Sequence, residues 1–311
     1  MARSTVASAF LNTSSGITVY LRALRWRSWI GWLFFFGLGS TLFVIPPYNV
    51  LPIAISFSIV TGAIFVLNQY FDRKSDIMNP QKRHLPVAAG ELSPKQSSVL
   101  VVSLFAIGLL VTAVVDYTLL FLFVTYIGVG IVYSTPPLHF KKRPVIDLLT
   151  VGVGSGILPF LMGMQASNQL LSDSSLLLIL ICIIPLFLFQ IASHIFQAIG
   201  DYEADKDEKI TTFVVKYGKQ KSAKIAVLFS SLSLIFPIIC GVLNFAVAKE
   251  IMYWYLLILL IFFPFAIYLI KLSANPTTKN IKSLMNASRR FTPILLLTLY
   301  LCVLILKVYL P

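Results

Sequence analysis

A long apolar run, VLPIAISFSIVTGAIFVLNQYF, occupies residues 50–71, and the carboxylates of Asp72 and Asp76 follow it. The run carries no charged residue and is long enough for an α-helix to cross a bilayer, which takes roughly 20 apolar residues. Side chains four residues apart lie on the same face of a helix, so Asn68, Asp72 and Asp76 would form one stripe. The stretch therefore predicts a membrane-spanning helix that ends in a stripe of oxygen-bearing side chains.

The whole chain has the composition of an integral membrane protein. Its 311 residues are 58% hydrophobic, and its mean hydropathy is +0.86, which is more apolar surface than a soluble domain can bury. About nine apolar runs of helical length lie near residues 28–46, 50–71, 97–115, 117–134, 146–166, 174–200, 222–244, 250–271 and 291–310. Because these runs do not alternate polar and apolar residues, they indicate helices and not the strands of a membrane barrel.

The links between the runs are too short to form a separate soluble domain. We therefore predict one all-α membrane domain over residues 1–311. It would contain two weakly related halves, at roughly 28–145 and 146–311, and each half would carry one acidic stripe.

The positive charge of the chain falls on one side of this arrangement. The formal net charge of +13 would by itself suit a nucleic-acid-binding protein. With nine spans, however, all Lys and Arg residues except Lys249 and Lys307 lie on the same side. Such a bias places the N-terminus and the active-site loops in the cytoplasm. The basicity is then explained by topology and by attraction to lipid headgroups, and we expect no nucleic-acid partner. We expect a multi-pass protein of the cell membrane.

A second acidic stretch, DYEADKDEK, follows the apolar run at 174–200. The chain holds only 12 carboxylates, and seven of them lie in the two acidic stretches. In the second stretch, Asp201 and Asp205 repeat the four-residue spacing of the first. Carboxylates at a membrane are costly and commonly mark function. One such pair is most often an ordinary solvated helix end, but two matched stripes on one side favour a functional site.

The chemistry of the two stripes suits a magnesium diphosphate. Mg²⁺ binds one or two carboxylates together with water and phosphate oxygens. Basic side chains that could bind the remaining diphosphate oxygens are Lys82 and Arg83, in the sequence NPQKRHLP, and Lys141, in YSTPPLHFKKR. Tyr133 precedes the Pro-Pro turn of the latter sequence, where it could face a cavity. Each of these four residues could alternatively be an ordinary interface residue.

Together these motifs resemble those of the UbiA superfamily of intramembrane prenyltransferases. The similarity rests on NxxxDxxxD, KRxLP, YSxPPxxxK and a second DxxxD followed by ITT, in that order over nearly the whole chain. It implies nine transmembrane helices around one central cavity, in an isoprenoid-synthase-like arrangement. It also implies Mg²⁺-dependent transfer of a prenyl group from a polyprenyl diphosphate donor to a hydrophobic acceptor.

The resemblance also implies roles for individual residues. The positions that match the family's metal-binding and catalytic residues are Asn68, Asp72, Asp76, Asp201 and Asp205. The diphosphate would be bound by Asn68, Lys82, Arg83 and Lys141, with Tyr133 beside them. Two positions depart from the usual pattern. Gln69 stands where many members have Asp, and His84 stands where the family usually has Pro.

The acceptor is left open by the sequence. The run HIFQAIGDYEAD at 194–205 resembles the carotenoid (lycopene) elongase branch, whereas an aromatic quinone precursor and a glycerol-phosphate lipid are the other candidates. A transporter is the alternative of a different class, but the predicted spans are nearly free of the charges that transporters carry near the midplane. His194, seven residues before Asp201, is a candidate for the proton-accepting base. A buried histidine with a structural hydrogen bond is an equally good interpretation.

Overall fold

The computed structural model describes most of the chain between residues 16 and 243. The described ranges are 16–41, 48–79, 82–168, 176–207 and 210–243, with a few residues between 270 and 286. Within these ranges every regular element is a helix, which confirms the expected all-α fold.

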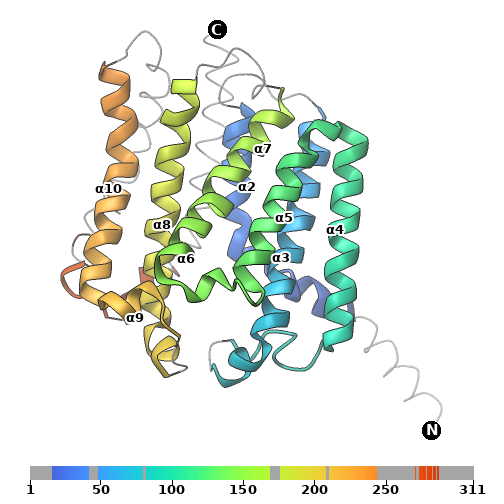
Figure 1. Ribbon diagram of the computed structural model, residues 1–311, viewed down its shortest axis with the longest axis horizontal. Helices are drawn as coiled ribbons and strands as arrows, with labels where there is room; N and C mark the ends of the chain where they lie inside the picture. Colours follow the sequence, from blue (N-terminus) through green and yellow to red (C-terminus); the bar gives the residue numbers. More distant parts are fainter. Residues whose placement is uncertain are drawn as a thin grey trace. The chain divides into compact units, whose positions relative to one another are not determined.

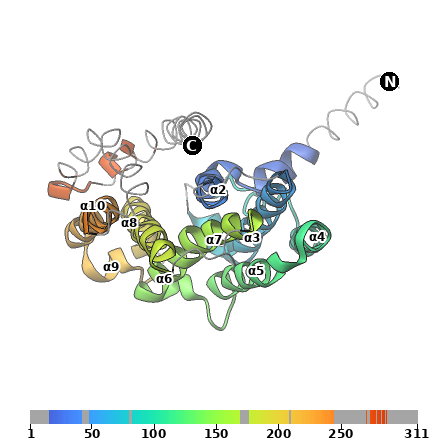
Figure 2. The ribbon, with the colours of Figure 1, turned by 90° about the horizontal axis from the view of Figure 1, so that it is seen from above.

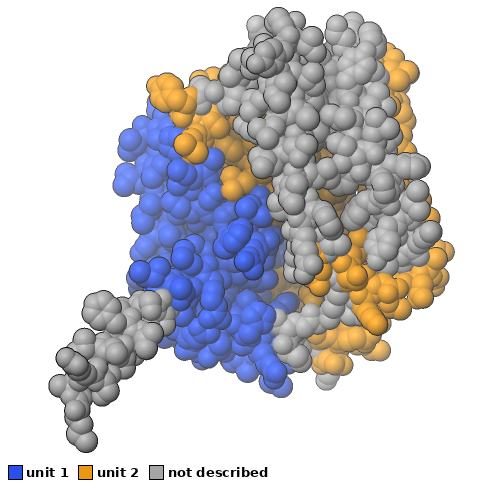
Figure 3. All heavy atoms as spheres, turned by 180° about the vertical axis from the view of Figure 1, so that it is seen from behind, with its two compact units in different colours: residues 1–30, 52–137 blue, residues 31–51, 138–311 orange. Residues whose placement is uncertain are grey.

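The chain forms two compact units, which Figure 3 shows in different colours. Unit 1 comprises Met1–Ile30 and Pro52–Pro137, and unit 2 comprises Gly31–Leu51 and Leu138–Pro311. A short segment from the N-terminal part of the sequence therefore belongs to the second unit. The single domain with halves meeting near residue 145 stays a prediction.

The long helices described in unit 1 run side by side (Figures 1 and 2). They are α3 (Val50–Met78, in unit 1 from residue 52), α4 (Pro94–Asp116) and α5 (Leu120–Ser134), and the 3-10 turn Tyr117–Leu119 joins the last two. A capping box begins α4. The Ser93 hydroxyl accepts from the backbone N–H of Gln96 at 3.2 Å, and the side-chain oxygen of Gln96 accepts from the backbone N–H of Ser93 at 2.9 Å. This arrangement satisfies two amide groups that a helix start would otherwise leave unpaired.

Buried hydroxyl groups link the helices of unit 1. The Ser56 hydroxyl of α3 donates to the carbonyl oxygen of Gly108 in α4 at 2.6 Å. The hydroxyls of Thr61 in α3 and Tyr126 in α5 lie 3.0 Å apart. Helices in a bilayer gain little from hydrophobic burial against each other, so such hydrogen bonds and close contacts hold them together.

The described part of unit 2 contains α2 from residue 31 onward and the helices that follow Leu138. The helices are α2 (Trp26–Thr41, in unit 2 from residue 31), α6 (Pro144–Val151), a π-helix (Gly152–Ile157), α7 (Leu158–Ala166), α8 (Leu176–Asp207), α9 (Phe213–Tyr217) and α10 (Lys219–Leu243). In Figures 1 and 2, α8 and α10 lie side by side. A 3-10 turn, Phe140–Lys142, precedes α6.

Small residues allow two backbones of unit 2 to touch. A Cβ atom on Gly163 of α7 would overlap the carbonyl oxygen of Phe36 in α2, and one on Gly39 would overlap the carbonyl oxygen of Phe160. The Ser167 hydroxyl, at the end of α7, also donates to the Ser40 carbonyl at 2.8 Å. This contact is the small-residue packing that is common between membrane helices.

The π-helix lies against α8. Its wider turn leaves the carbonyl oxygen of Ser155 to accept a hydrogen bond from the Gln190 side chain of α8, at 3.1 Å. Gly152 and Gly156 of the π-helix lie against Phe187 and Leu186 of α8, and added Cβ atoms would clash with these residues.

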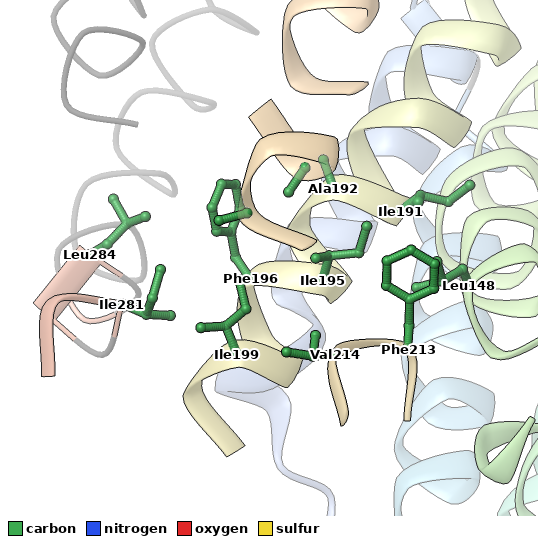
Figure 4. Close-up of a cluster of buried hydrophobic side chains, with 12 residues drawn as sticks. Leu148, Ile191, Ala192, Ile195, Phe196, Ile199, Phe213, Val214, Ile281 and Leu284 are labelled. Atoms are coloured by element: carbon green, nitrogen blue, oxygen red, sulfur yellow. The ribbon is translucent and has the colours of Figure 1, made fainter. Parts of the chain in front are cut away.

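Figure 4 shows the buried apolar cluster that surrounds the lower part of α8. Ile195 and Ile199 of α8 are fully buried there, together with Val214 of α9, and Leu148 of α6 joins them. The cluster thus holds the turns of α8 that lead to Asp201 against α6 and α9.

Five helical stretches within the described ranges are long and apolar enough to cross a membrane. They are Val50–Met78, Pro94–Ser134, Pro144–Ala166, Leu176–Asp207 and Lys219–Leu243, of which the second contains both α4 and α5. Apart from residue 270, the apolar runs at 250–271 and 291–310 lie outside the described residues. The total of nine spans therefore stays a prediction.

Candidate active site

The first acidic stripe lies in the last turns of α3, in unit 1. The helix continues without a break through Asn68, Asp72 and Asp76 to Met78, so the four-residue spacing puts the three side chains on one face. Asp76 is buried, with 5% of its surface exposed, and Asn68 and Asp72 are half-buried. The side chains of the stripe are therefore partly or fully buried.

A hydrogen bond connects this stripe to the YSTPP sequence. The side-chain amide of Asn68 donates to the hydroxyl oxygen of Ser134, which is fully buried at the end of α5, with the two atoms 3.3 Å apart. Because the Asn68 nitrogen is engaged, its carbonyl oxygen is left as the atom that can bind a metal ion or a donor group. Tyr133, the neighbouring residue on α5, is half-buried.

Gln69 stands where many family members have Asp, and its side chain binds the backbone of a neighbouring segment. Its side chain is fully buried, and its amide nitrogen donates to the carbonyl oxygens of Ala23, at 2.7 Å, and Phe65, at 3.2 Å. The chain turns directly after Ala23, where Arg25 has a positive φ of 51°. Gln69 therefore satisfies a carbonyl group at a break between helices.

The basic residues Lys82 and Arg83 lie in a compact turn that follows α3. Their backbone amides both donate to the carbonyl oxygen of Asn79, at 3.0 and 2.9 Å, and the Arg73 side chain of α3 donates to the Val87 carbonyl at 3.3 Å. These bonds hold the turn against the end of the helix that carries the first stripe. The side chain of His84 is exposed on this turn.

The second acidic stripe lies in the last turns of α8, in unit 2. Asp201 and Asp205 are both half-buried and are one helical turn apart. Glu203, between them, points elsewhere, because its exposed carboxylate pairs with the Lys219 ammonium group at 2.6 Å. The ammonium group also lies 4.5 Å from the ring centroid of Tyr202. Glu203 thus belongs to an ion pair with the start of α10.

Lys141 lies in unit 2, at the end of a tight turn before α6. It is half-buried within the 3-10 turn Phe140–Lys142, and the guanidinium of Arg143 lies 5.7 Å from the ring centroid of Phe140.

The structure divides the predicted site residues between the two units. Unit 1 carries Asn68, Asp72, Asp76, Lys82, Arg83 and Tyr133, and unit 2 carries Lys141, Asp201 and Asp205.

A histidine–carboxylate pair lies deeper in unit 2. The Nε2 atom of His194 in α8 is 2.9 Å from Oδ2 of Asp147 in the first turn of α6. Asp147 is almost completely buried, with 3% of its surface exposed. The two residues are 47 positions apart in the sequence.

The donor atoms of each stripe fit Mg²⁺ as a partial set of ligands. Carboxylate and amide oxygens are hard ligands of the kind that Mg²⁺ prefers. In the described part of the chain, no group of three or more His, Cys, Asp or Glu side chains could hold a metal ion. An ion bound at either stripe would therefore take its remaining ligands from water or from phosphate oxygens, as Mg²⁺ commonly does, and at the first stripe also from Asn68.

The positions of these motifs can be compared with those of known proteins. A model of the UbiA prenyltransferase family matches residues 23–292, a range that includes both stripes, the Lys82–Arg83 turn and the YSTPP sequence. The chain belongs to the UbiA prenyltransferase family. Membership of this family, together with the five long apolar stretches, makes the chain a multi-pass integral membrane protein.

Individual UbiA relatives are just over a quarter identical to this chain over the part that aligns. The lycopene elongase/hydratase of Corynebacterium glutamicum is 29% identical over 207 residues, which are 64% of this chain and 63% of that protein. The digeranylgeranylglyceryl phosphate synthase of Saccharolobus solfataricus is 28% identical over 215 residues, 69% of this chain and 71% of that protein. The chain thus spans somewhat less than two thirds of the length of the first relative.

The fold is that of solved UbiA structures. The UbiA homologue from Archaeoglobus fulgidus bound to DMAPP and Mg²⁺ superimposes with a TM-score of 0.72 at 19% identity, over 91% of this chain and 98% of that chain. This likeness confirms the UbiA-like helical arrangement that the motifs predicted.

The sequence pattern did not reveal the contact between Asp147 and His194. Asp147 lies outside both acidic stretches and follows a basic sequence, so nothing in its spacing pairs it with His194. The scarcity of carboxylates was the one available signal, because an acid in an apolar segment is costly and needs a partner. Gln69 departs from the usual family pattern in the sequence, but its contact with Ala23 depends on packing alone.

Proposed function

We propose that this protein transfers a prenyl group from a polyprenyl diphosphate to a lipophilic acceptor within the membrane. The observation that carries the proposal is the pair of matched acidic stripes, at the ends of α3 and α8, in a chain of the UbiA family. A relative of the same fold, solved with DMAPP and Mg²⁺, supports the choice of donor and metal.

The stripe residues would hold Mg²⁺ and, through it, the diphosphate. The proposed metal ligands are Asn68, Asp72, Asp76, Asp201 and Asp205. When bound, Mg²⁺ supplies positive charge that stabilises diphosphate as a leaving group. The hydrogen bond from Asn68 to Ser134 would orient the Asn68 carbonyl oxygen, because it fixes which end of the amide is free.

Basic residues would bind the diphosphate oxygens that the metal leaves exposed. Lys82 and Arg83, held against α3 by their turn, and Lys141, before α6, are proposed for this role, with Tyr133 beside them. The allylic C–O bond breaks and the diphosphate leaves with the electron pair. The acceptor then forms a bond to the allylic carbon and loses a proton, in surroundings from which water is excluded.

We place both stripes on the cytoplasmic side of the membrane. The bias of Lys and Arg supports this orientation, since Lys249 and Lys307 alone fall on the opposite side of a nine-span arrangement. A donor that is made in the cytoplasm would then reach the stripes without crossing the bilayer.

For the acceptor we propose a carotenoid such as lycopene. The sequence from His194 to Asp205 and the 29% identity to a lycopene elongase/hydratase support this choice. A glycerol-phosphate lipid is the second candidate, because the digeranylgeranylglyceryl phosphate synthase matches over a larger share of the chain.

The test is prenyl transfer by the full-length protein in lipid vesicles, with radiolabelled geranylgeranyl diphosphate and Mg²⁺. Lycopene, geranylgeranylglyceryl phosphate and an aromatic quinone precursor serve as acceptors. We expect a labelled lipid product with lycopene that disappears with EDTA, in Asp72→Ala and in Asp201→Ala. Glu203→Gln is the matched control, because it changes a carboxylate of α8 that lies off the stripe and pairs with Lys219. The absence of product with all three acceptors would refute the proposal.

A further inference from the structure

The transfer reaction releases a proton, and the stripe residues cannot take it while they bind a metal ion. Within unit 2, His194 and Asp147 form a largely buried ionisable pair that the proposed mechanism leaves unused. Its position, geometry and exposure can each be compared with what a proton acceptor requires.

The histidine of the pair lies on the same helix as the second stripe, nearer the middle of the span. His194 and Asp201 are seven residues apart on α8, and seven residues are nearly two full turns, so both lie on the same helix face. The rise of an α-helix places His194 about 10 Å along the axis from Asp201, toward the interior of the span. A diphosphate bound at the stripe would extend its allylic carbon in this direction.

The contact with Asp147 sets the hydrogen positions on the ring. A carboxylate can only accept a hydrogen bond, so the Nε2 atom of His194 carries the proton that points to Oδ2 of Asp147, 2.9 Å away. In the neutral ring, Nδ1 is then the atom with a free electron pair. Among the described residues, no second hydrogen-bond partner of the ring is found. The pair thus presents a nitrogen that can accept a proton.

The environment of Asp147 suits the stabilisation of a protonated ring. The side chain of Asp147 is 4% exposed, whereas that of His194 is 20% exposed. The second oxygen, Oδ1, is buried and has no hydrogen-bond partner among the described residues. Asp147 lies in the first turn of α6, near the positive end of the helix dipole. Asp201 and Asp205 also act electrostatically on the ring.

A purely structural pair would be expected to look different. Two groups that only join α6 to α8 would both be buried, and each would have its hydrogen-bonding capacity satisfied. Here Asp147 is buried with its Oδ1 unpaired among the described residues, and the ring of His194 is partly exposed. The hydrogen bond of Gln190 to Ser155 and the glycine contacts of the π-helix already hold α8 in place.

We propose that His194 accepts the proton that the acceptor loses during prenyl transfer, and that Asp147 positions the imidazole and stabilises its protonated form. This inference rests on the proposed function. As the allylic carbon bonds to the acceptor, the C–H or O–H bond of the acceptor breaks and its proton moves to Nδ1 of His194. The proton later passes to water or to the departing diphosphate, and the neutral ring is restored.

Three variants test the pair in the vesicle assay with geranylgeranyl diphosphate and the three acceptors. His194→Ala removes the base, and His194→Gln keeps a hydrogen bond to Asp147 but has no basic nitrogen. Asp147→Asn can donate to Nε2, which would place the proton on Nδ1, the wrong atom. Gln197→Ala is the control, because this residue is exposed on the same helix. Donor binding is measured separately, from the thermal stabilisation by geranylgeranyl diphosphate with Mg²⁺.

We expect turnover to fall by about 100-fold or more in all three variants, as loss of general base catalysis commonly causes. The KM for the donor should stay within about threefold of the wild-type value, because the diphosphate site is intact. Added imidazole should restore part of the turnover of His194→Ala and none of that of Asp72→Ala.

Several outcomes would overturn the assignment. If His194→Ala or His194→Gln turns over within about threefold of wild type, His194 is not the proton acceptor. If both histidine variants lose donor binding or fail to fold, the pair only holds α6 against α8. In both cases an active wild type and an active Gln197→Ala leave the proposed function standing. If the wild type itself forms no product with any acceptor, the proposed function fails, and this inference fails with it.

Discussion

The side-chain amide of Asn68 lies 3.3 Å from the hydroxyl oxygen of Ser134 and donates a hydrogen bond to it. This contact joins two motifs of unit 1 that are 66 residues apart in the sequence, the acidic stripe of α3 and the YSTPP sequence at the end of α5. Ser134 therefore supports the candidate site through Asn68, although Ser134 carries no charge.

Removal of the Ser134 hydroxyl should weaken donor binding. In Ser134→Ala the Asn68 amide loses its partner, and a buried side-chain hydrogen bond contributes about 1 kcal/mol. We expect the Kd for geranylgeranyl diphosphate with Mg²⁺ to rise by about fivefold, while the protein still folds. Isothermal titration in detergent measures this constant. Ser98→Ala, on the exposed side of α4, is the control, and an unchanged Kd in Ser134→Ala would show that the contact does not orient Asn68.

Gln69 should matter for stability and not for metal binding. In Gln69→Leu the buried carbonyl group of Ala23 loses its hydrogen bond, and an unpaired buried acceptor costs about 1–3 kcal/mol. We expect a lower Tm in a thermal unfolding scan but the same dependence of activity on Mg²⁺ concentration. Gln197→Leu, at an exposed position of α8, should leave the Tm nearly unchanged. A shifted Mg²⁺ dependence in Gln69→Leu would instead make Gln69 part of the metal site.

The contact between α2 and α7 predicts opposite effects for two glycine substitutions. Gly163→Ala would force the added Cβ into the Phe36 carbonyl oxygen, and overpacking of this kind costs about 1–3 kcal/mol. The Cβ of Gly128→Ala in α5 meets no atom within 4 Å. Because alanine favours the helix over glycine by about 0.5–1 kcal/mol, this variant should be as stable as wild type or slightly more so. Thermal unfolding in detergent compares them, and equal Tm values would contradict the close backbone contact.

Metal and donor should stabilise the protein only together. A ligand that binds the folded state stabilises it by about 2.7 kcal/mol at 100 times its Kd. We expect geranylgeranyl diphosphate to raise the Tm in the presence of Mg²⁺ and to lose most of this effect with EDTA. In Asp76→Asn, which removes one charge from the buried end of the first stripe, the shift should be much smaller. A full shift in EDTA would mean that the basic residues bind the donor without a metal ion.

The sequence by itself determined the all-helical character of the chain, the two acidic stripes and the family. Backbone groups in a bilayer must form their hydrogen bonds within the segment, so a long apolar run has few choices other than a helix. The spacing of Asn68, Asp72 and Asp76 then follows from the helical period alone. Such features depend on neighbours in the sequence, and the sequence shows them directly.

The tertiary structure alone decided which faces of these helices meet. It paired His194 with Asp147, formed the hydrogen bond from Gln69 to the Ala23 carbonyl, and placed Gly31–Leu51 in unit 2. Between apolar helices in lipid no hydrophobic force selects one face over another, so close contacts at glycines and a few hydrogen bonds make the choice. Those contacts join residues that lie far apart in the sequence, and no local period of the sequence records them.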